Sequence, residues 1–545
     1  MNGRARLTRL ALTLAATLPA AGAFRYLAAQ AAAAPGGGWT AQNEVVYQIF
    51  VRSFRDSNGD RIGDLTGIRQ SLPYLQKLGV TSLLLTPINP SPTYHNYFAS
   101  RFDGVDPAYG SAQDLHALIE AVHARGMKIY LDEEDQYAVQ GNPWLDSSLG
   151  NPASRYADDI LYDDSAHTKT TPIIYGLTAL PTWTGAKIPV AVVNLRDTAV
   201  VAYFGNLYAS LADPNHDGRF DDGVDGFRLD HMMDDLDGNP RLTHLFADFW
   251  APVFARVRAV NPRIRFIAEQ ADWGYGEDWL TRGGADMVFG FPLRMAIVTL
   301  NRDSIARAIA GVLAHVPAGK GVLTFIENHD VNRFASVVGG DPRKERVGAA
   351  LDVLLAGTPL IYYGQEIGMK GLHSQAWNSD ANDIPDREAM KWTRRLKDPG
   401  EATWYKDTGA WWTDRFNRDD DGISVAEERG NPRSLLSYYR RLLALRRARP
   451  EIRSGTERVV GAKAAGVLAV LRSLPSAASL LVVNLSDSAA TAVVPGDSLP
   501  AGLAARPLRD LLTGRSVRRS AGTLRVALTP WEVTVIGTTE HGGVR

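Results

Sequence analysis

The sequence predicts an α/β protein built on a (β/α)8 TIM barrel, with a small domain inserted after the third strand and a C-terminal antiparallel β-sandwich domain. From Glu44 to about Arg446, short β-rich runs alternate with helical segments, as in parallel strands joined by crossover helices. An overlong connection runs from Gln136 to Asp222, and connections of that length usually have a function. After Pro450 the pattern changes to alternating runs such as SLLVVNL, which are typical of antiparallel strands.

Eight candidate strands supply the number that a closed barrel of this kind requires. They are residues 45–51, 82–86, 128–132, 224–230, 265–269, 286–291, 323–330 and 359–363. Between them, Ser111 followed by Asp114 predicts a capped helix that stops at Gly126. The expected organisation is an export signal in 1–35, the barrel in 40–135 and 201–449, the inserted domain in 136–200 and the β-domain in 450–540.

The composition of the chain indicates which classes of molecule it binds. The 545 residues include 59 basic and 60 acidic ones, for a formal net charge of -1, and contain no long basic run. This balance argues against nucleic-acid binding and suits a neutral, polyhydroxylated substrate. We expect a monomer.

The N-terminus predicts export. Arg4, Arg6 and Arg9 precede an apolar stretch at 10–24 and an Ala-rich segment at 28–38, the order of a cleavable signal. An uncleaved membrane anchor is the alternative. No comparable apolar run follows, so we expect no membrane association after cleavage. The chain has no cysteine, and a fold without disulfides is compatible with a bacterial periplasmic or extracellular location.

Three candidate strands carry an acid at or near their carboxyl ends: VDGFRLD ends at Asp230, IRFIAEQ contains Glu269, and VLTFIENHD ends at Asp330. Side chains at the carboxyl ends of barrel strands converge at one mouth. A retaining glycosidase needs two carboxyl groups about 5 to 5.5 Å apart, one as nucleophile and one as acid. Isolated acids at strand ends more often cap helices or pair with arginines, so the set of three is the informative feature.

In order and local sequence, these stretches resemble the signature regions of the α-amylase family of glycoside hydrolases. The resemblance extends to VVYQIFVRSF, LLLTPINPSPTYHNY, GTPLIYYGQEIGMKG and NPRSLLSYYRRLLALR. It implies that Asp230 is the nucleophile, Glu269 the acid and Asp330 a third acid that binds sugar hydroxyls. The residues that it implies for substrate binding are Tyr97, as an aromatic platform, with Arg228, His329, His95 and Tyr137.

Two positions depart from the family pattern. At the end of the third strand the chain reads LDEEDQYA, with Gln136 and Tyr137 where the family has Asn-His. The resemblance implies a contact between this His and the sugar at the cleavage point, and Tyr137 replaces that His here. Four residues after the nucleophile, Asp234 stands where the family has His. In many members the Asn and this later His hold an interdomain calcium ion, so we expect that ion site to be absent here. Tyr137 still offers a hydroxyl donor.

A structural calcium ion is expected instead in the segment DSNGDRIGD. Its candidate ligands are Asp56, Asn58, Asp60 and Asp64, with the carbonyl of Ile62. Calcium takes six to eight oxygen ligands, which acids at alternate positions of a tight loop can supply. The segment also resembles a calcium loop of some family members. The alternative is a solvated acidic turn.

The expected function is hydrolysis of α-1,4-glucosidic bonds in starch-like glucans or maltooligosaccharides, through a covalent glycosyl-enzyme. An α-glucosidase, a neopullulanase-like enzyme or a transglycosylase of the trehalose synthase kind is the alternative within the family. A non-catalytic carbohydrate-binding protein is the alternative from another class. For Trp273, Trp404, Trp411 and Trp412, packing in the core is the expectation, and further sugar subsites are the alternative.

Overall fold

The structure, a computed structural model, describes residues 43–409, 416–500, 503, 507–520 and 522–538. The predicted export signal in residues 1–35 lies outside the described residues. Within them, no helix combines the length and the apolar character needed to cross a membrane.

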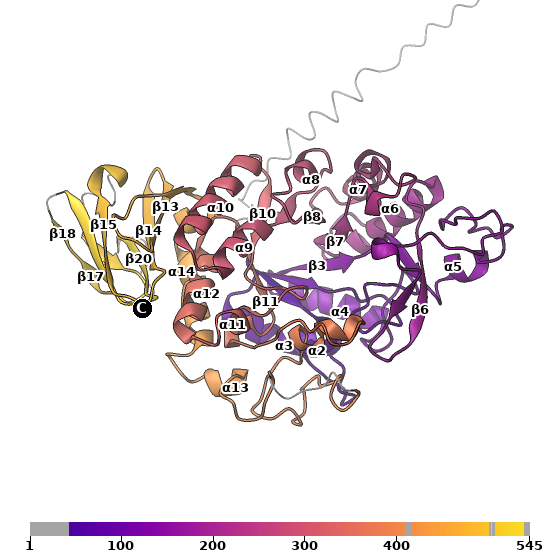
Figure 1. Ribbon diagram of the computed structural model, residues 1–545, viewed down its shortest axis with the longest axis horizontal. Helices are drawn as coiled ribbons and strands as arrows, with labels where there is room; N and C mark the ends of the chain where they lie inside the picture. The colour runs from indigo at the N-terminus through magenta and orange to yellow at the C-terminus, as the bar shows by residue number, and fades with distance from the viewer. Residues whose placement is uncertain (1–42, 410–415, 501–502, 504–506, 521, 539–545) are drawn as a thin grey trace, which may run out of the picture. The chain divides into compact units, whose positions relative to one another are not determined.

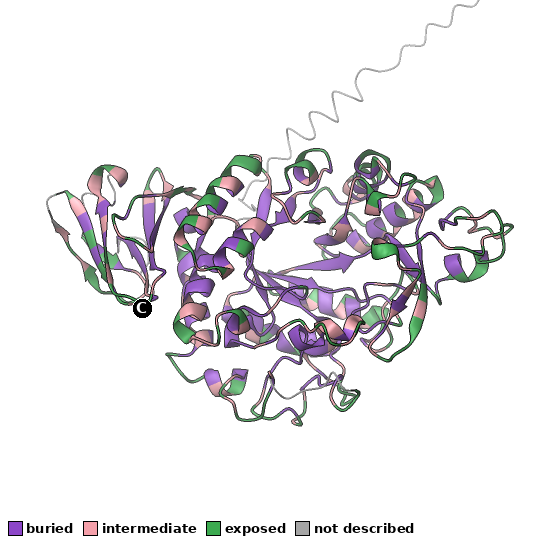
Figure 2. Ribbon diagram, viewed as in Figure 1, coloured by how far each residue is buried: buried purple, intermediate pink, exposed green. Residues whose placement is uncertain are grey.

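A closed barrel of eight parallel strands forms the centre of the fold, as predicted (Figure 1). Around the barrel the strands are β1 (Val46–Ile49), β2 (Ser82–Leu85), β3 (Lys128–Glu133), β7 (Gly226–Met232), β8 (Arg265–Gln270), β9 (Met287–Phe289), β10 (Gly321–Thr324) and β11 (Thr358–Tyr362). They are buried on both faces (Figure 2), which explains their almost unbroken apolar sequences. Inside the barrel, Tyr130, Ile267 and Phe289 belong to one apolar cluster.

The predicted seventh strand is the main correction to the barrel. We expected a strand over residues 323–330, but β10 ends at Thr324. Beyond it, the Glu327 carboxylate pairs with Arg333 and accepts the backbone N–H of Phe334, and the Asn328 side chain accepts the N–H of Asp330. These side chains bond to the backbone locally and replace a continued ladder with a turn.

Helices between the strands cover the barrel. They are α3 (Leu65–Leu78), α4 (Ala112–His123), α6 (Thr198–Ala212), α7 (Ala251–Val260), α8 (Glu277–Thr281), α9 (Phe291–Val298), α10 (Arg302–His315), α12 (Pro342–Leu354) and α14 (Leu435–Ala448). The predicted cap of α4 is confirmed: Ser111 and Asp114 form a reciprocal capping box. Its Leu115, Leu118, Ile119 and Val122 are buried.

Additional antiparallel sheets lie in the long connection and at the C-terminus. In the connection, β4 (Tyr137–Val139), β6 (Lys187–Val192) and β5 (Ala179–Pro181) pair in that order. The C-terminal strands, in sheet order, are β12 (Thr456–Val459), β13 (Val467–Leu474), β14 (Ala477–Asn484), β20 (Val533–Gly537), β16 (Leu508–Asp510) and β17 (Ser516–Val517), then β15 (Ala490–Pro495), β19 (Thr523–Leu528) and β18 (Arg519–Ser520). One apolar cluster joins these two C-terminal sheets, as in a β-sandwich.

Candidate active site

One arginine joins three carboxyl groups at the mouth of the barrel. Arg228 on β7 is fully buried. Its Nη1 donates to Asp132 Oδ1 at 2.7 Å and to Asp230 Oδ1 at 2.5 Å, and its Nη2 lies 2.8 Å from Glu269 Oε2. The acids come from β3, β7 and β8, which are adjacent in the barrel. The structure therefore brings Asp230 and Glu269 together, with Asp132 as a third member.

A β-bulge orients two of these acids. The register between β7 and β8 shifts between Leu229 and Met232, where β7 has one residue more than its partner. Within the bulge, His231 has a φ of 48°, and its N–H donates to Glu269 Oε2 at 3.1 Å. Bulges redirect side chains and occur often beside active sites. This bulge explains how Asp230 and Glu269 reach the same guanidinium.

The balance of charges in this cluster favours protonation of some of its carboxyl groups. Burial raises the pKa of Asp132 to about 7, against the lowering effect of Arg228. Burial also raises the pKa of Asp230; Arg228 opposes this, while Glu269 and Asp132 add to it. Because three carboxyl groups share one cation, the cluster favours holding some of them protonated. An ionised carboxylate beside a protonated one is the arrangement that acid and nucleophile chemistry needs.

A hydrogen-bonded chain links Tyr97 to the cluster. Gln48 Nε2 lies 3.1 Å from His329 Nδ1, and His329 Nε2 lies 2.5 Å from the Tyr97 hydroxyl, which donates to Asp132 Oδ2 at 2.7 Å. Burial lowers the pKa of His329, and Arg387 lowers it further, so the ring is neutral. If the Gln48 amide donates to Nδ1, the ring proton lies on Nε2 and points to Tyr97.

Asp330 is held by a second arginine, Arg387, and not by Arg228. It lies in the turn beyond β10, where its Oδ1 is 3.2 Å from Arg387 Nη2. Arg387 also donates to the carbonyl of His329 at 2.8 Å and lies 3.3 Å from Asp383 Oδ2. Burial raises the pKa of Asp330 and Arg387 lowers it. Arg387 thus fixes the turn that carries the third acid.

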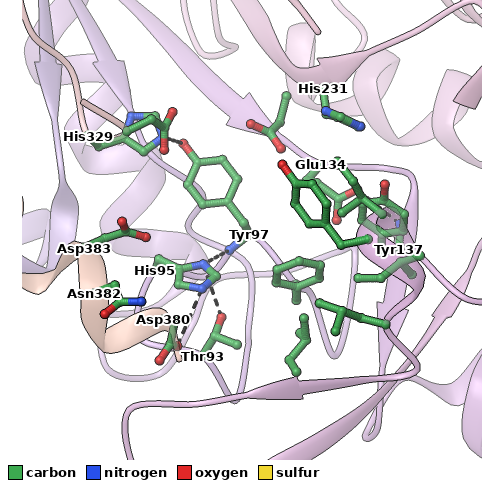
Figure 3. A pocket seen from close by; sticks show the side chains of 18 of the residues that line it. Thr93, His95, Tyr97, Glu134, Tyr137, His231, His329, Asp380, Asn382 and Asp383 are labelled. Atoms are coloured by element: carbon green, nitrogen blue, oxygen red, sulfur yellow. Dashed lines mark hydrogen bonds and ion pairs between the residues drawn. The ribbon is translucent and has the colours of Figure 1, made fainter. Parts of the chain in front are cut away.

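These groups line a cavity of about 760 Å³, which also contacts the β4–β6 connection (Figure 3). Asp230, Glu269, Asp330, Tyr97, Tyr137, His329 and His95 all border it. His95 is neutral, because burial lowers its pKa to about 3, and its Nδ1 accepts the N–H of Tyr97 at 3.2 Å. Arg228 lies behind this wall, so its predicted part in substrate binding is indirect.

Of the four tryptophans that we expected to pack in the core, Trp411 and Trp412 lie outside the described residues. Trp404 is buried, as expected, and stacks on Tyr94. Trp273 is partly buried, packs against the apolar cluster inside the barrel with its ring stacked on Phe291, and also borders the cavity.

The two departures from the family pattern at the third strand have defined partners. Gln136 Nε2 donates to the carbonyl oxygens of Asp230 and His231 at 2.8 and 2.9 Å. The Tyr137 hydroxyl donates to Asp237, whose other oxygen lies 3.0 Å from His231 Nε2. Tyr137 therefore presents its ring to the cavity, while its hydroxyl is already bonded.

Glu134, Asp383 and Arg387 are among the polar residues of the cavity wall that sequence reasoning missed. Alternation along the third strand would have found Glu134, which lies two residues after Asp132. No comparable signal marks the segment with Asp383 and Arg387, which begins in a 3-10 helix at Asp380–Asp386.

The predicted calcium loop is well ordered by its own side chains. Asp56 and Asp64 are buried; Asp56 accepts three backbone N–H groups of the turn, and Asp64 caps α3. Among the described residues, neither has an ion-pair partner within 4.0 Å, and no three or more His, Cys, Asp or Glu side chains gather as metal ligands do. Carboxylates, the Asn58 amide and the Ile62 carbonyl together still form an oxygen set that suits a hard cation. Asp60 remains exposed, with its Oδ1 accepting the N–H of Ile62.

A parallel barrel with two carboxyl groups held together at its mouth is the arrangement that a retaining glycosidase with a TIM-barrel fold requires. Comparison with known proteins agrees. Residues 48–242 and 282–455 match the family model of the alpha-amylase catalytic domain. Alpha-amylase 3 of Dictyoglomus thermophilum is 26% identical over 82% of this chain and 85% of its own length. The 4-alpha-glucanotransferase of Thermotoga maritima is 30% identical over 72% of this chain and 84% of its own.

Among solved structures, the alpha-amylase from H. orenii superposes with a TM-score of 0.74 at 25% identity, covering 91% of this chain and 99% of that one. The chain belongs to the alpha-amylase family of glycoside hydrolases. It is therefore an enzyme acting on glycosidic bonds, and the non-catalytic alternative is set aside.

Proposed function

We propose that the protein is a retaining hydrolase of α-1,4-glucosidic bonds in starch-like glucans or maltooligosaccharides. The observation that carries this proposal is the shared guanidinium. Asp230 and Glu269 both bond to Arg228, at 2.5 and 2.8 Å, where they border the cavity. A single cation keeps the two carboxyl groups close together, and a retaining mechanism needs them about 5 to 5.5 Å apart.

In this mechanism Asp230 attacks the anomeric carbon while Glu269 protonates the leaving oxygen, which yields a covalent glycosyl-enzyme. Glu269 then removes a proton from the water that hydrolyses this intermediate. Arg228 stabilises the ionised form of Asp230. Asp330 hydrogen-bonds sugar hydroxyls, and Tyr97 offers an apolar ring face to the sugar.

Retention of configuration tests the mechanism directly. Two displacements at the anomeric carbon return the α-configuration, so proton NMR during the first minutes of hydrolysis is expected to detect α-anomeric product. Initial release of the β-anomer contradicts the assignment.

The relatives support one second candidate, an α-glucosidase, neopullulanase-like enzyme or transglycosylase with the same acids, since a glucanotransferase is among them. Amylose, pullulan, maltose, sucrose and trehalose, followed by product chromatography, separate these activities. Reducing sugar released from amylose supports the hydrolase. Conversion of maltose to trehalose, or chain-length redistribution without new reducing ends, supports the transglycosylase.

We also propose one structural calcium ion, held by Asp56, Asn58, Asp60, Asp64 and the Ile62 carbonyl. Two buried carboxylates with no basic partner among the described residues support this site. Metal analysis of the purified protein after dialysis is expected to find one equivalent of calcium.

Export from a bacterial cell, as a monomer, completes the proposal. The N-terminal basic and apolar pattern supports export, and the absence of cysteine is compatible with it. N-terminal sequencing of protein from the periplasm or medium is expected to find a new end near residue 35. Light scattering is expected to give a monomer mass.

A further inference from the structure

Glu134 is a fourth acid in the wall of the cavity. It lies directly after β3, which ends at Glu133, and two residues after Asp132. Glu134 is 6% exposed and borders the cavity, where Figure 3 draws it beside Tyr137 and His231. Nothing in the mechanism above uses it.

The two oxygens of Glu134 differ in their bonding. Oε1 accepts the backbone N–H groups of Gln136 and Tyr137, at 2.7 and 3.1 Å. Oε2 is buried and has no hydrogen-bond partner among the described residues. A buried polar atom without a partner costs free energy unless a ligand satisfies it.

A proton on Glu134 belongs on Oε2, since Oε1 already accepts two donors. Burial raises the pKa of this carboxyl, and the negative charge of Asp230 raises it further. When protonated, Oε2 is a hydroxyl donor.

The neighbouring groups on this wall are already bonded. Tyr137, at the position of the family's sugar-binding His, donates its hydroxyl to Asp237. The wall therefore lacks the contact that the family pattern supplies there, and Glu134, which borders the cavity, has a buried oxygen, Oε2, without a hydrogen-bond partner among the described residues. On the basis of the proposed function, we propose that Glu134 binds substrate, with Oε2 donating to a hydroxyl oxygen of the glucosyl unit beside Asp230.

Two substitutions at Glu134 separate this role from simple packing. Glu134→Gln keeps an acceptor at Oε1 and an N–H donor at the Oε2 position, so kcat/KM is expected to stay within about threefold of the parent. Glu134→Ala removes the donor and is expected to lower kcat/KM by about tenfold to a hundredfold. Glu133→Gln is the matched control, because Glu133 is equally buried but does not border the cavity; we expect no change.

The substrate hydroxyl is identified with α-maltotriosyl fluoride and analogues that lack the 2-, 3- or 6-hydroxyl on the reacting unit. For the analogue that lacks the hydroxyl bound by Glu134, the kcat/KM of the parent is expected to fall by the same factor as Glu134→Ala causes with the complete substrate. With that analogue, Glu134→Ala is expected to cause no further loss. Fully additive losses on every analogue, or a Gln variant as impaired as the Ala variant, overturn the assignment. Circular dichroism checks folding, and a parent inactive on all α-glucans refutes the proposed function instead.

Discussion

Replacing Arg228 with Met is expected to destabilise the protein in a pH-dependent way. The substitution keeps an unbranched side chain over Phe289 but removes the cation that lies 2.5 to 2.8 Å from three carboxyl groups. Breaking a buried ion pair costs about 3–5 kcal/mol when the remaining charge is left unpaired. Since three acids share this cation, we expect a loss at the upper end of that range at neutral pH.

The sign of this pH dependence follows from the raised pKa values of the acids. An acid whose pKa is higher in the folded state than in the unfolded state costs stability above the folded pKa, and that cost disappears as pH falls towards the unfolded value. For Asp132 this window runs from about 7 down to 3.8. Without Arg228, the pKa values of Asp132 and Asp230 rise further, because its charge lowers both. The deficit relative to the parent is therefore largest at alkaline pH and narrows as pH falls.

The assay is thermal unfolding at one fixed scan rate, at about pH 5 and about pH 8. Phe289→Leu is the control, since Phe289 is fully buried, lies 5.6 Å from the Arg228 guanidinium carbon and carries no charge. Its deficit is expected to be the same at both pH values. An equal deficit for Arg228→Met at both pH values would refute the electrostatic reasoning and assign the loss to packing.

Three further predictions concern the acids and the ion. Asp230→Asn is expected to abolish turnover in a folded protein, because an amide cannot form the glycosyl-enzyme; activity within about tenfold of the parent removes this role. Glu269→Gln is expected to stop starch hydrolysis yet to spare part of the activity on α-maltotriosyl fluoride, whose leaving group needs no proton; equal losses contradict it. Asp56→Ala combined with Asp60→Ala is expected to abolish the chelator-induced drop in melting temperature, and an unchanged drop excludes this loop.

The sequence predicts the barrel because buried parallel strands leave a strong local signal. Each observed strand overlaps a predicted one, and Asp230 and Glu269 lie where strand ends were expected. The prediction failed where polar side chains replaced the ladder: Asp330 lies six residues beyond the end of β10, since Glu327 and Asn328 bond to the local backbone.

Long-range contacts explain why some features of the site could not be predicted from the sequence. Arg387 contacts Asp330 from a segment without periodicity, 57 residues further along the chain, and no spacing rule connects residues that distant. The bulge at His231 is similarly invisible, because a φ of 48° in a non-glycine residue follows from the surrounding packing. Glu134 is the exception, since simple alternation from Asp132 predicts its direction.

The contacts of Gln136 and Tyr137, which replace the family's Asn-His, are those of an intact active site. Gln136 and Tyr137 come from the start of the long connection, and both reach the strand that carries the nucleophile: Gln136 through two backbone carbonyls, and Tyr137 through Asp237 and then His231. Loss of catalysis would leave such positions free to lose their partners. Here Gln136 bonds directly to the bulge that orients Asp230 and Tyr137 is linked to it through Asp237, so the departure from Asn-His replaces one set of contacts with another. The sugar contact that this exchange removes is the one that Glu134 is placed to supply.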